Sequence, residues 1–103
     1  MSPRGIEVWR NGRKVFLRDP VDINRELMRR GCKPKQPVYF LGCRAGEGDD
    51  PIAKQYADRY RVRTVGSTQY TWWGSGGFGG TYGKNSAGGK DLDSPGQWRP
   101  FGP

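Results

Sequence analysis

Residues 37–43 read Pro-Val-Tyr-Phe-Leu-Gly-Cys, and this apolar stretch decides the fold that the sequence predicts. The run from Val38 to Cys43 leaves no polar side for solvent, which is typical of a strand buried on both faces of a parallel sheet. Apolar residues then recur at helical spacing over 52–60, and a second β-rich segment follows at 62–65. A strand, a helix and a strand in this order predict a right-handed βαβ unit. We therefore expect residues 38–43 to form an inner strand with a neighbour on each side.

Two further elements precede this unit. Residues 6–17 are predicted to form a β-hairpin, because Asn11-Gly12 between two β-rich segments is a strong signal for a tight turn. A helix is expected to begin after Asp19, which suits the N-cap and is followed by a proline. The same helix should end at Gly31, since glycine adopts the backbone conformation that terminates helices.

The composition changes at Gly66. From there to the C-terminus the chain holds eleven of its seventeen glycines, and seven aromatic residues are interspersed among them. A glycine-rich segment without aromatic anchors would be disordered, so we expect residues 67–103 to pack as a tail on a core formed by residues 1–66. Four rings of this tail should be at least partly buried: Trp72, Trp73, Trp98 and Phe101.

The predicted fold class is therefore α/β. It comprises a small mostly parallel sheet, an N-terminal β-hairpin, two helices and a C-terminal tail that is rich in glycine and aromatic residues. At 103 residues the chain is long enough for a single domain and too short for two. It could equally be a piece of a larger polypeptide.

The charge of the chain points to an acidic partner. Lysine and arginine number 18 against 10 acidic residues, which gives a net charge of +8. Such a balance favours nucleic acid or an acidic protein, although a solvated surface can also simply be basic. Arginine and lysine near exposed tryptophans would suit the backbone and the bases of RNA. The residues predicted to bind nucleic acid or an acidic partner are Lys33, Lys35, Arg59, Arg61, Arg63, Trp72 and Trp73.

Several classes of function are excluded by composition. The chain contains no histidine, which rules out a Ser-His-Asp triad, a Cys-His dyad and a histidine-ligated metal built from this chain alone. Its two cysteines do not form a CxxC pair or a disulfide framework. No apolar run is long enough for a membrane span, and the N-terminus lacks the apolar stretch of a signal peptide. We expect no cofactor and no bound metal.

Cys43 is a candidate nucleophile because of its place in the predicted fold. It ends the predicted strand, and in open α/β sheets sites collect at that edge. The adjacent Arg44 and the N-terminus of the following helix, which Asp50 should cap, would both favour a thiolate. The backbone from Arg44 to Gly46 could supply N–H donors to an oxyanion. The plainer interpretation is that Cys43 packs in the interior, as most buried cysteines do.

Four segments of the chain are familiar in sequence and order. They are residues 2–6 (SPRGI), 37–46 (PVYFLGCRAG), 52–57 (IAKQYA) and 95–103 (PGQWRPFGP). With these segments the chain resembles the C-terminal toxin module of bacterial Rhs-repeat and haemagglutinin-like polymorphic toxins. The turn at Cys43 is similar to the nucleophile turn of caspase-like peptidases, although only Cys43 and Gly46 match. The His-Gly pair of that pattern would fall before Ser2 and is missing.

The resemblance implies a secreted effector that acts in the cytoplasm of a target cell and is neutralised by an acidic immunity protein. Its chemistry would centre on Cys43 as the nucleophile of a caspase-like hydrolase, with Arg44 and Gly46 beside it. Two alternatives stay open: a histidine-free ribonuclease or nucleic-acid-binding toxin, and a non-catalytic protein-binding module. Replacing Cys43 separates the first hypothesis from the others, and salt-sensitive RNA binding identifies the second.

Overall fold

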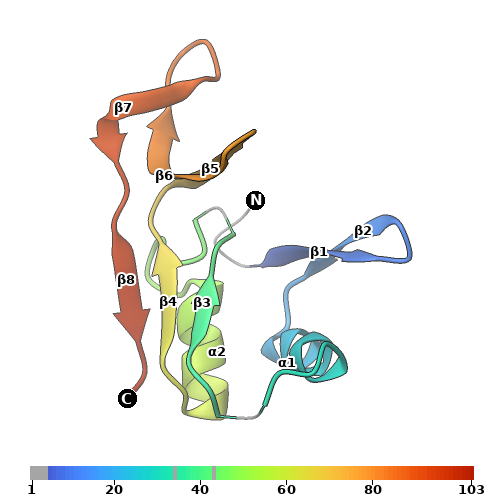
Figure 1. The fold of residues 1–103 in the computed structure, drawn as a ribbon. Helices are drawn as coiled ribbons and strands as arrows, with labels where there is room; N and C mark the ends of the chain where they lie inside the picture. The colour runs from blue at the N-terminus through green and yellow to red at the C-terminus, as the bar shows by residue number, and fades with distance from the viewer. Residues whose placement is uncertain (1–4, 34, 43) are drawn as a thin grey trace.

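The computed structural model describes residues 5–33, 35–42 and 44–103. In these ranges the chain forms two helices and eight strands (Figure 1). The first part of the chain contains β1 (Ile6–Arg10), β2 (Arg13–Leu17), α1 (Pro20–Arg29), β3 (Val38–Phe40), α2 (Ile52–Tyr60) and β4 (Thr64–Ser67). The second part contains β5 (Tyr70–Gly74), β6 (Gly77–Lys84), β7 (Lys90–Pro95) and β8 (Trp98–Phe101). The described strands form three small sheets, β1–β2, β3–β4–β8 and β5–β6–β7.

The predicted hairpin and the first helix are confirmed. β1 and β2 pair antiparallel, and Asn11 and Gly12 between them have φ angles of 49° and 76°. These are the left-handed conformations that a two-residue hairpin turn requires. The carboxylate of Asp19 accepts a hydrogen bond of 2.8 Å from the N–H of Val21, so Asp19 caps α1 as expected. Gly31 has a φ of 87° and follows the end of the helix.

The prediction of a mostly parallel sheet is wrong. Of the five strand pairings in the described residues, only that of β3 with β4 is parallel. The order of the central sheet is β3–β4–β8, so β4 is its inner strand and β3 lies at an edge. The apolar run at 38–43 does not mark burial on both faces, because Phe40 is 4% exposed whereas Tyr39 is 67% exposed. Its side chains alternate between a covered and an uncovered face.

The glycine-rich segment is a structural part of the fold, not a loose tail. β8 takes the second side of β4, with Thr64 opposite Phe101 and Ser67 opposite Trp98. β5, β6 and β7 form an antiparallel sheet of their own. The indole N–H of Trp72 in β5 also donates to the carbonyl of Tyr82 in β6 at 2.9 Å, which ties these two strands together.

The expected burial of the four rings in this segment is confirmed only in part. Trp72 and Phe101 are half-buried. Trp73 is 60% exposed and Trp98 is 40% exposed.

The hydrophobic core lies between α2 and one face of the central sheet, and Leu17 of β2 and Ile23 of α1 complete it. Ile52, Ala53 and Tyr56 of α2 are buried, and the rings of Tyr56 and Phe40 meet edge-on with centroids 5.7 Å apart. The expectation that Asp50 caps this helix is wrong, because the N-cap is Pro51 and makes no side-chain hydrogen bond. Instead the N–H of Ala53 donates to the carbonyl of Ala45 at 3.1 Å, since the preceding loop folds back over the helix start.

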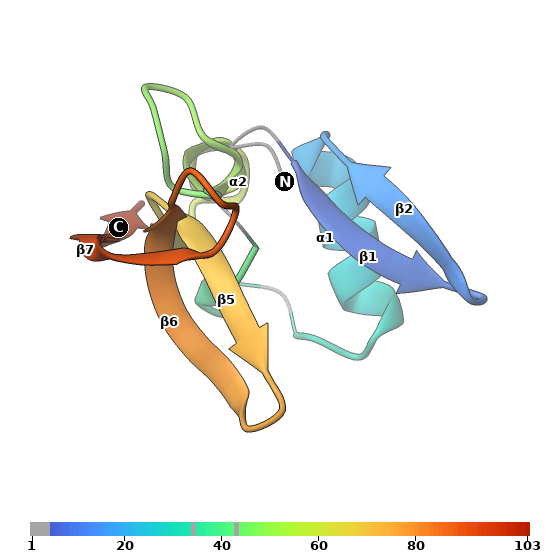
Figure 2. The same cartoon turned by 90° about the horizontal axis from the view of Figure 1, so that it is seen from above.

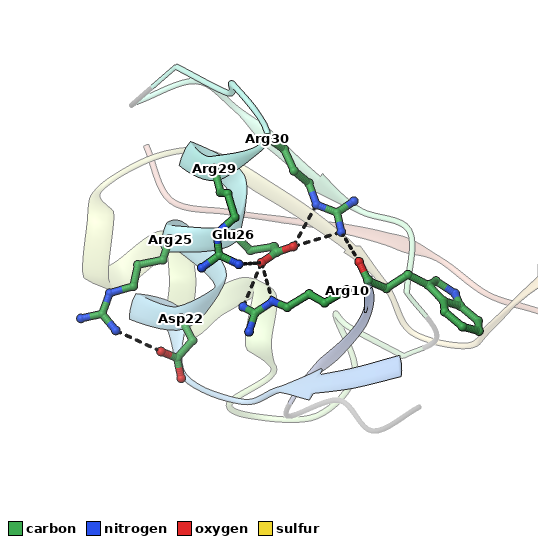
Figure 3. A network of polar contacts seen from close by, with 7 residues as sticks. Arg10, Asp22, Arg25, Glu26, Arg29 and Arg30 are labelled. Carbon is green, nitrogen blue, oxygen red and sulfur yellow. Dashed lines mark hydrogen bonds and ion pairs between the residues drawn. The ribbon is translucent and has the colours of Figure 1, made fainter. Parts of the chain in front are cut away.

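A buried carboxylate ties the hairpin to α1. Glu26 is only 4% exposed, and Arg10 of β1 and Arg30 donate to its two oxygens at 2.9 and 3.0 Å (Figure 3). Arg29 adds a third guanidinium at 3.1 Å. Burial alone would raise the pKa of Glu26, but hydrogen bonds from Arg10 and Arg30 and the charge of Arg29 outweigh it and lower that pKa. Arg30 also donates to the carbonyl of Trp9 at 2.9 Å, which fixes β1 against the helix.

Replacing Glu26 by glutamine should lower the melting temperature by several degrees near neutral pH, because three guanidinium groups lose their shared carboxylate. A carboxyl group whose pKa is lowered by folding stabilises the protein above its unfolded pKa, and this contribution is lost as the pH falls through the folded value. The difference between wild type and Glu26→Gln should therefore shrink in acid. Circular dichroism melts over a pH series measure it, with Glu7→Gln as a control at an exposed, loosely paired carboxylate. Equal melting temperatures near neutral pH would contradict this role of Glu26.

Deleting residues 95–103 removes β8 and should cost about 2–5 kcal/mol of unfolding free energy, since β4 loses a neighbour and Phe101 leaves the core. Urea denaturation followed by circular dichroism measures the loss. Phe101→Ala provides a milder variant if the truncated chain does not fold, and it should shift the midpoint in the same direction. An unchanged midpoint in either variant would show that β8 is dispensable.

Candidate nucleic-acid interface

No helix in the described residues covers the second face of the central sheet, although Ser67 at the end of β4 is buried on that face against Thr81 of β6. Phe40 packs on Tyr56 of α2, and the hydroxyl of Thr64 donates to the carbonyl of Ala53 in the same helix at 2.6 Å. Because successive side chains of a strand point to opposite faces, the residues next to Phe40 and Thr64 point away from α2. These are Tyr39 and Val65, which lie opposite one another in the register, and Val65 in turn lies opposite Pro100 of β8. A row of three apolar side chains therefore crosses the sheet on its open side.

The hairpin of β5 and β6 extends this open side. Figure 2 shows its tip on the side of the sheet away from α2. The rings of Trp73 and Phe78 at this tip are 5.0 Å apart, and Phe78 lies 5.9 Å from Trp98 of β8. All three rings are exposed. We call the combined surface the aromatic face; its members are Tyr39, Val65, Trp73, Phe78, Trp98 and Pro100.

A groove borders the aromatic face along the free edge of β3. It has a volume of about 620 Å³ and lies between β3 and the N-terminal hairpin, with Trp9, Tyr39 and Trp73 in its lining. A smaller pocket of about 170 Å³ lies on the other side of Tyr39 and is lined by Lys33 and Lys35. Tyr39 thus connects the groove, the aromatic face and a basic region.

The five basic residues predicted from the sequence gather at one end of the molecule. β3 and β4 are parallel and begin side by side, as the 2.9 Å hydrogen bond from the N–H of Val38 to the carbonyl of Arg63 shows. The turn before β3 carries two lysines, and the last turn of α2 and the segment after it carry three arginines. Cations are favoured at the C-terminus of a helix by its dipole. We call this region the basic end (bottom of Figure 1); its members, all exposed, are Lys33, Lys35, Arg59, Arg61 and Arg63.

The two tryptophans predicted to act with these residues are placed differently from each other. Trp73 belongs to the aromatic face, whereas Trp72 is half-buried and its indole N–H is engaged by Tyr82. Sequence reasoning missed Tyr39, which it assigned to a buried strand, and Trp9. Tyr39 alternates with Val38 and Phe40, so its side chain points to the other face of the strand. That face need not be buried when only one face of a sheet is covered, and this alternation could have identified Tyr39.

The turn that follows Cys43 is held in place by its own backbone. Cys43 itself lies outside the described residues. The N–H of Arg44 donates to the carbonyl of Gln69 at 3.0 Å, and that of Gly46 donates to Ser67 at 2.8 Å. Of the predicted oxyanion donors from Arg44 to Gly46, the amides at both ends therefore already have acceptors, and the guanidinium of Arg44 is paired with Glu47. An oxyanion could use these two amides only after the turn had left β4 and the segment that follows it.

Gly46 is required by close packing in this turn. A Cβ atom at Gly46 would collide with the backbone carbonyl of Gly66, and one at Gly66 would lie 2.7 Å from the backbone nitrogen of Gly46, so the two segments meet with no room for a side chain. This contact presses the turn against the central strand. It gives Gly46 a structural role that does not depend on Cys43.

No helix in the ranges 5–33, 35–42 and 44–103 is long and apolar enough to cross a membrane. Among the same residues, no group of three or more cysteine, aspartate or glutamate side chains is placed to hold a metal ion.

The arrangement that stands out is therefore a surface of exposed rings that joins a cluster of five cations. Comparison of this chain with protein-family models, with curated proteins and with solved structures gave no match.

Proposed function

We propose that this domain binds single-stranded RNA, with bases stacked on the aromatic face and phosphates held by the basic end. One observation carries the proposal: the open face of the central sheet presents exposed rings, and Tyr39 joins them to the lysines before β3. Soluble proteins rarely expose such a contiguous apolar patch unless it binds something.

The chemistry of the surface fits an unpaired strand. Every base offers a π face, and stacking on an aromatic side chain contributes about 1–3 kcal/mol per base without regard to sequence. The phosphates of the same strand are drawn to lysine and arginine, and the net charge of +8 strengthens this attraction over the whole domain. A duplex keeps its bases stacked on one another, so it could use the basic end but not the aromatic face.

The biological setting that we propose follows from the resemblance to polymorphic toxin modules. In that setting the domain is a secreted effector that enters the cytoplasm of a target cell and acts on RNA there. An acidic immunity protein would neutralise it by covering the basic end. Both the RNA and the immunity protein would then compete for the same cations.

Removing single rings should weaken binding of a fluorescein-labelled uridine oligomer of about ten nucleotides. Tyr39→Ala and Trp98→Ala should each raise the Kd by a factor of about 5–150, which corresponds to the loss of one stacked base. Leu92→Ala is the matched control, because Leu92 is an exposed apolar side chain on β7 outside the aromatic face. Fluorescence anisotropy gives the three constants. If the control weakens binding as much as the two ring variants, or if no variant changes the Kd, the aromatic face is not the binding surface.

Removing cations from the basic end should make RNA binding weaker and less dependent on salt concentration. Arg59→Ala and Arg63→Ala should each weaken binding at low salt and reduce the slope of log Kd against log salt concentration by about one, because each releases one fewer counterion. Lys54→Ala removes a cation that is already paired with Asp58 at 2.8 Å and should change the slope less. Equal slopes for wild type and the arginine variants would show that the basic end does not contact phosphate.

Cys43→Ala should leave the affinity for RNA unchanged, because the proposed contacts are made by the aromatic face and the basic end, and Cys43 belongs to neither. The variant is tested by anisotropy and by expression in bacteria, with growth as the second readout. Growth inhibition that disappears in Cys43→Ala while RNA binding persists would favour the cysteine nucleophile over RNA binding as the function.

A further inference from the structure

The groove beside β3 differs from the aromatic face in offering polar groups between aromatic walls. Trp9 and Trp73 are exposed rings in its lining, and they come from opposite parts of the chain. The wall that carries Trp9 is held in place, because Arg30 donates to the carbonyl of Trp9 and is itself bound by the buried Glu26. The groove is therefore bounded on that side by a fixed element rather than by a loose hairpin.

The floor of the groove is the free edge of β3. The N–H of Val38 donates to the carbonyl of Arg63, the residue before β4, which turns the N–H and C=O groups of Val38 toward the sheet interior. Backbone groups of successive residues in a strand alternate between its two sides, so those of Tyr39 face the groove. In the described residues no strand pairs with β3 on that side. The N–H of Tyr39 is a donor and its C=O is an acceptor, and the edge of a nucleobase can form hydrogen bonds with such a pair.

Glu7 adds the group that can distinguish one base from another. It lines the groove and is the only carboxylate in the described part of that lining. Its nearest cation is Lys14, at 3.7 Å, and both side chains are largely open to solvent, so the pair is loose. Lys14 also lies over the ring of Trp9, with its ammonium 5.5 Å from the ring centroid. A carboxylate next to a stacked ring is placed to accept hydrogen bonds from the edge of a base, while Lys14 can turn to a phosphate.

The hydrogen-bonding edges of the bases respond differently to a carboxylate. Guanine presents two neighbouring N–H donors, at N1 and N2, which a carboxylate can accept together. Adenine presents a lone pair at N1, which a carboxylate repels, and uracil presents one N–H between two carbonyl oxygens. Recognition of this edge is available only in unpaired nucleotides.

We propose that the groove between β3 and the N-terminal hairpin is a base-reading subsite that selects guanine through the carboxylate of Glu7. The inference rests on the proposed function, because the guanine belongs to the same RNA strand whose other bases lie on the aromatic face. Tyr39 borders both surfaces and sets the path of the strand from one to the other.

The test compares three labelled RNA oligomers of about ten nucleotides: all uridine, one central guanosine and one central adenosine. Wild-type protein should bind the guanosine oligomer about 10-fold more tightly than the adenosine oligomer, which is the discrimination expected of a bidentate contact. Glu7→Gln should reduce this ratio to about 2 or less while binding of the adenosine oligomer stays the same or improves slightly. Asp58→Asn is the matched control, because it changes the net charge equally on an exposed part of α2 and should keep the full ratio.

The possible results separate the two proposals. Binding of all three oligomers with equal affinity by wild type, or a guanosine preference that survives in Glu7→Gln, overturns the guanine subsite and leaves RNA binding standing. Absence of binding to every oligomer overturns both. A circular dichroism melt of Glu7→Gln that matches wild type confirms that a lost preference reflects the groove and not unfolding.

Discussion

The structure depends on one short strand having a partner on each side. β4 accepts β3 in parallel on one edge and β8 in antiparallel on the other, and α2 packs behind it (Figure 1). Thr64 and Ser67 of this strand are fully buried, and Gly66 lets the turn before α2 approach its backbone. β8 reaches β4 from more than thirty residues further along the chain, so the fold closes only when the C-terminal strand arrives. Long-range closure of this kind costs loop entropy before it yields any packing.

The central sheet has a helix on only one side, and this asymmetry produces the surface that we propose as functional. A sheet is normally buried against a second layer, and a chain of 103 residues with a low apolar content has little material for a third. The open face nevertheless carries aromatic side chains, where a sheet facing only water would carry polar ones. The fold therefore maintains exposed rings beside a cluster of cations, and stacking on nucleic acid accounts for both features together.

Local signals in the sequence predicted local structure well. Asn11-Gly12 located the hairpin and Asp19 the start of α1, because turns and caps depend on a few neighbouring residues. The pairing of β4 with β8 was not predicted, since it joins residues more than thirty positions apart. The parallel sheet was predicted wrongly because a continuous apolar run looks the same whether its second face is covered or open.

The candidate site was likewise predicted only where neighbouring residues in the sequence are sufficient to show it. The five residues of the basic end were identified from sequence, since clusters of arginine and lysine are visible without a fold. The aromatic face was not, because Tyr39, Phe78 and Trp98 come from three strands whose alignment only the structure gives. The turn after Cys43 illustrates the opposite error: the amides of Arg44 and Gly46 looked free in the sequence, whereas the fold uses them to hold the turn against β4 and the segment that follows it.

The central claim is that the open face of the sheet, and not another part of the molecule, receives the RNA strand. Its most direct test is a two-dimensional ¹⁵N NMR titration of the intact chain with an unlabelled oligouridine. The account predicts that the shifted signals come from the backbone amides of Tyr39 and Val65, the indole N–H of Trp73 and Trp98, and the amides of the basic end. Shifts confined to the outer side of α2 or to the turn at residues 44–48, with the indole signals unmoved, would contradict it.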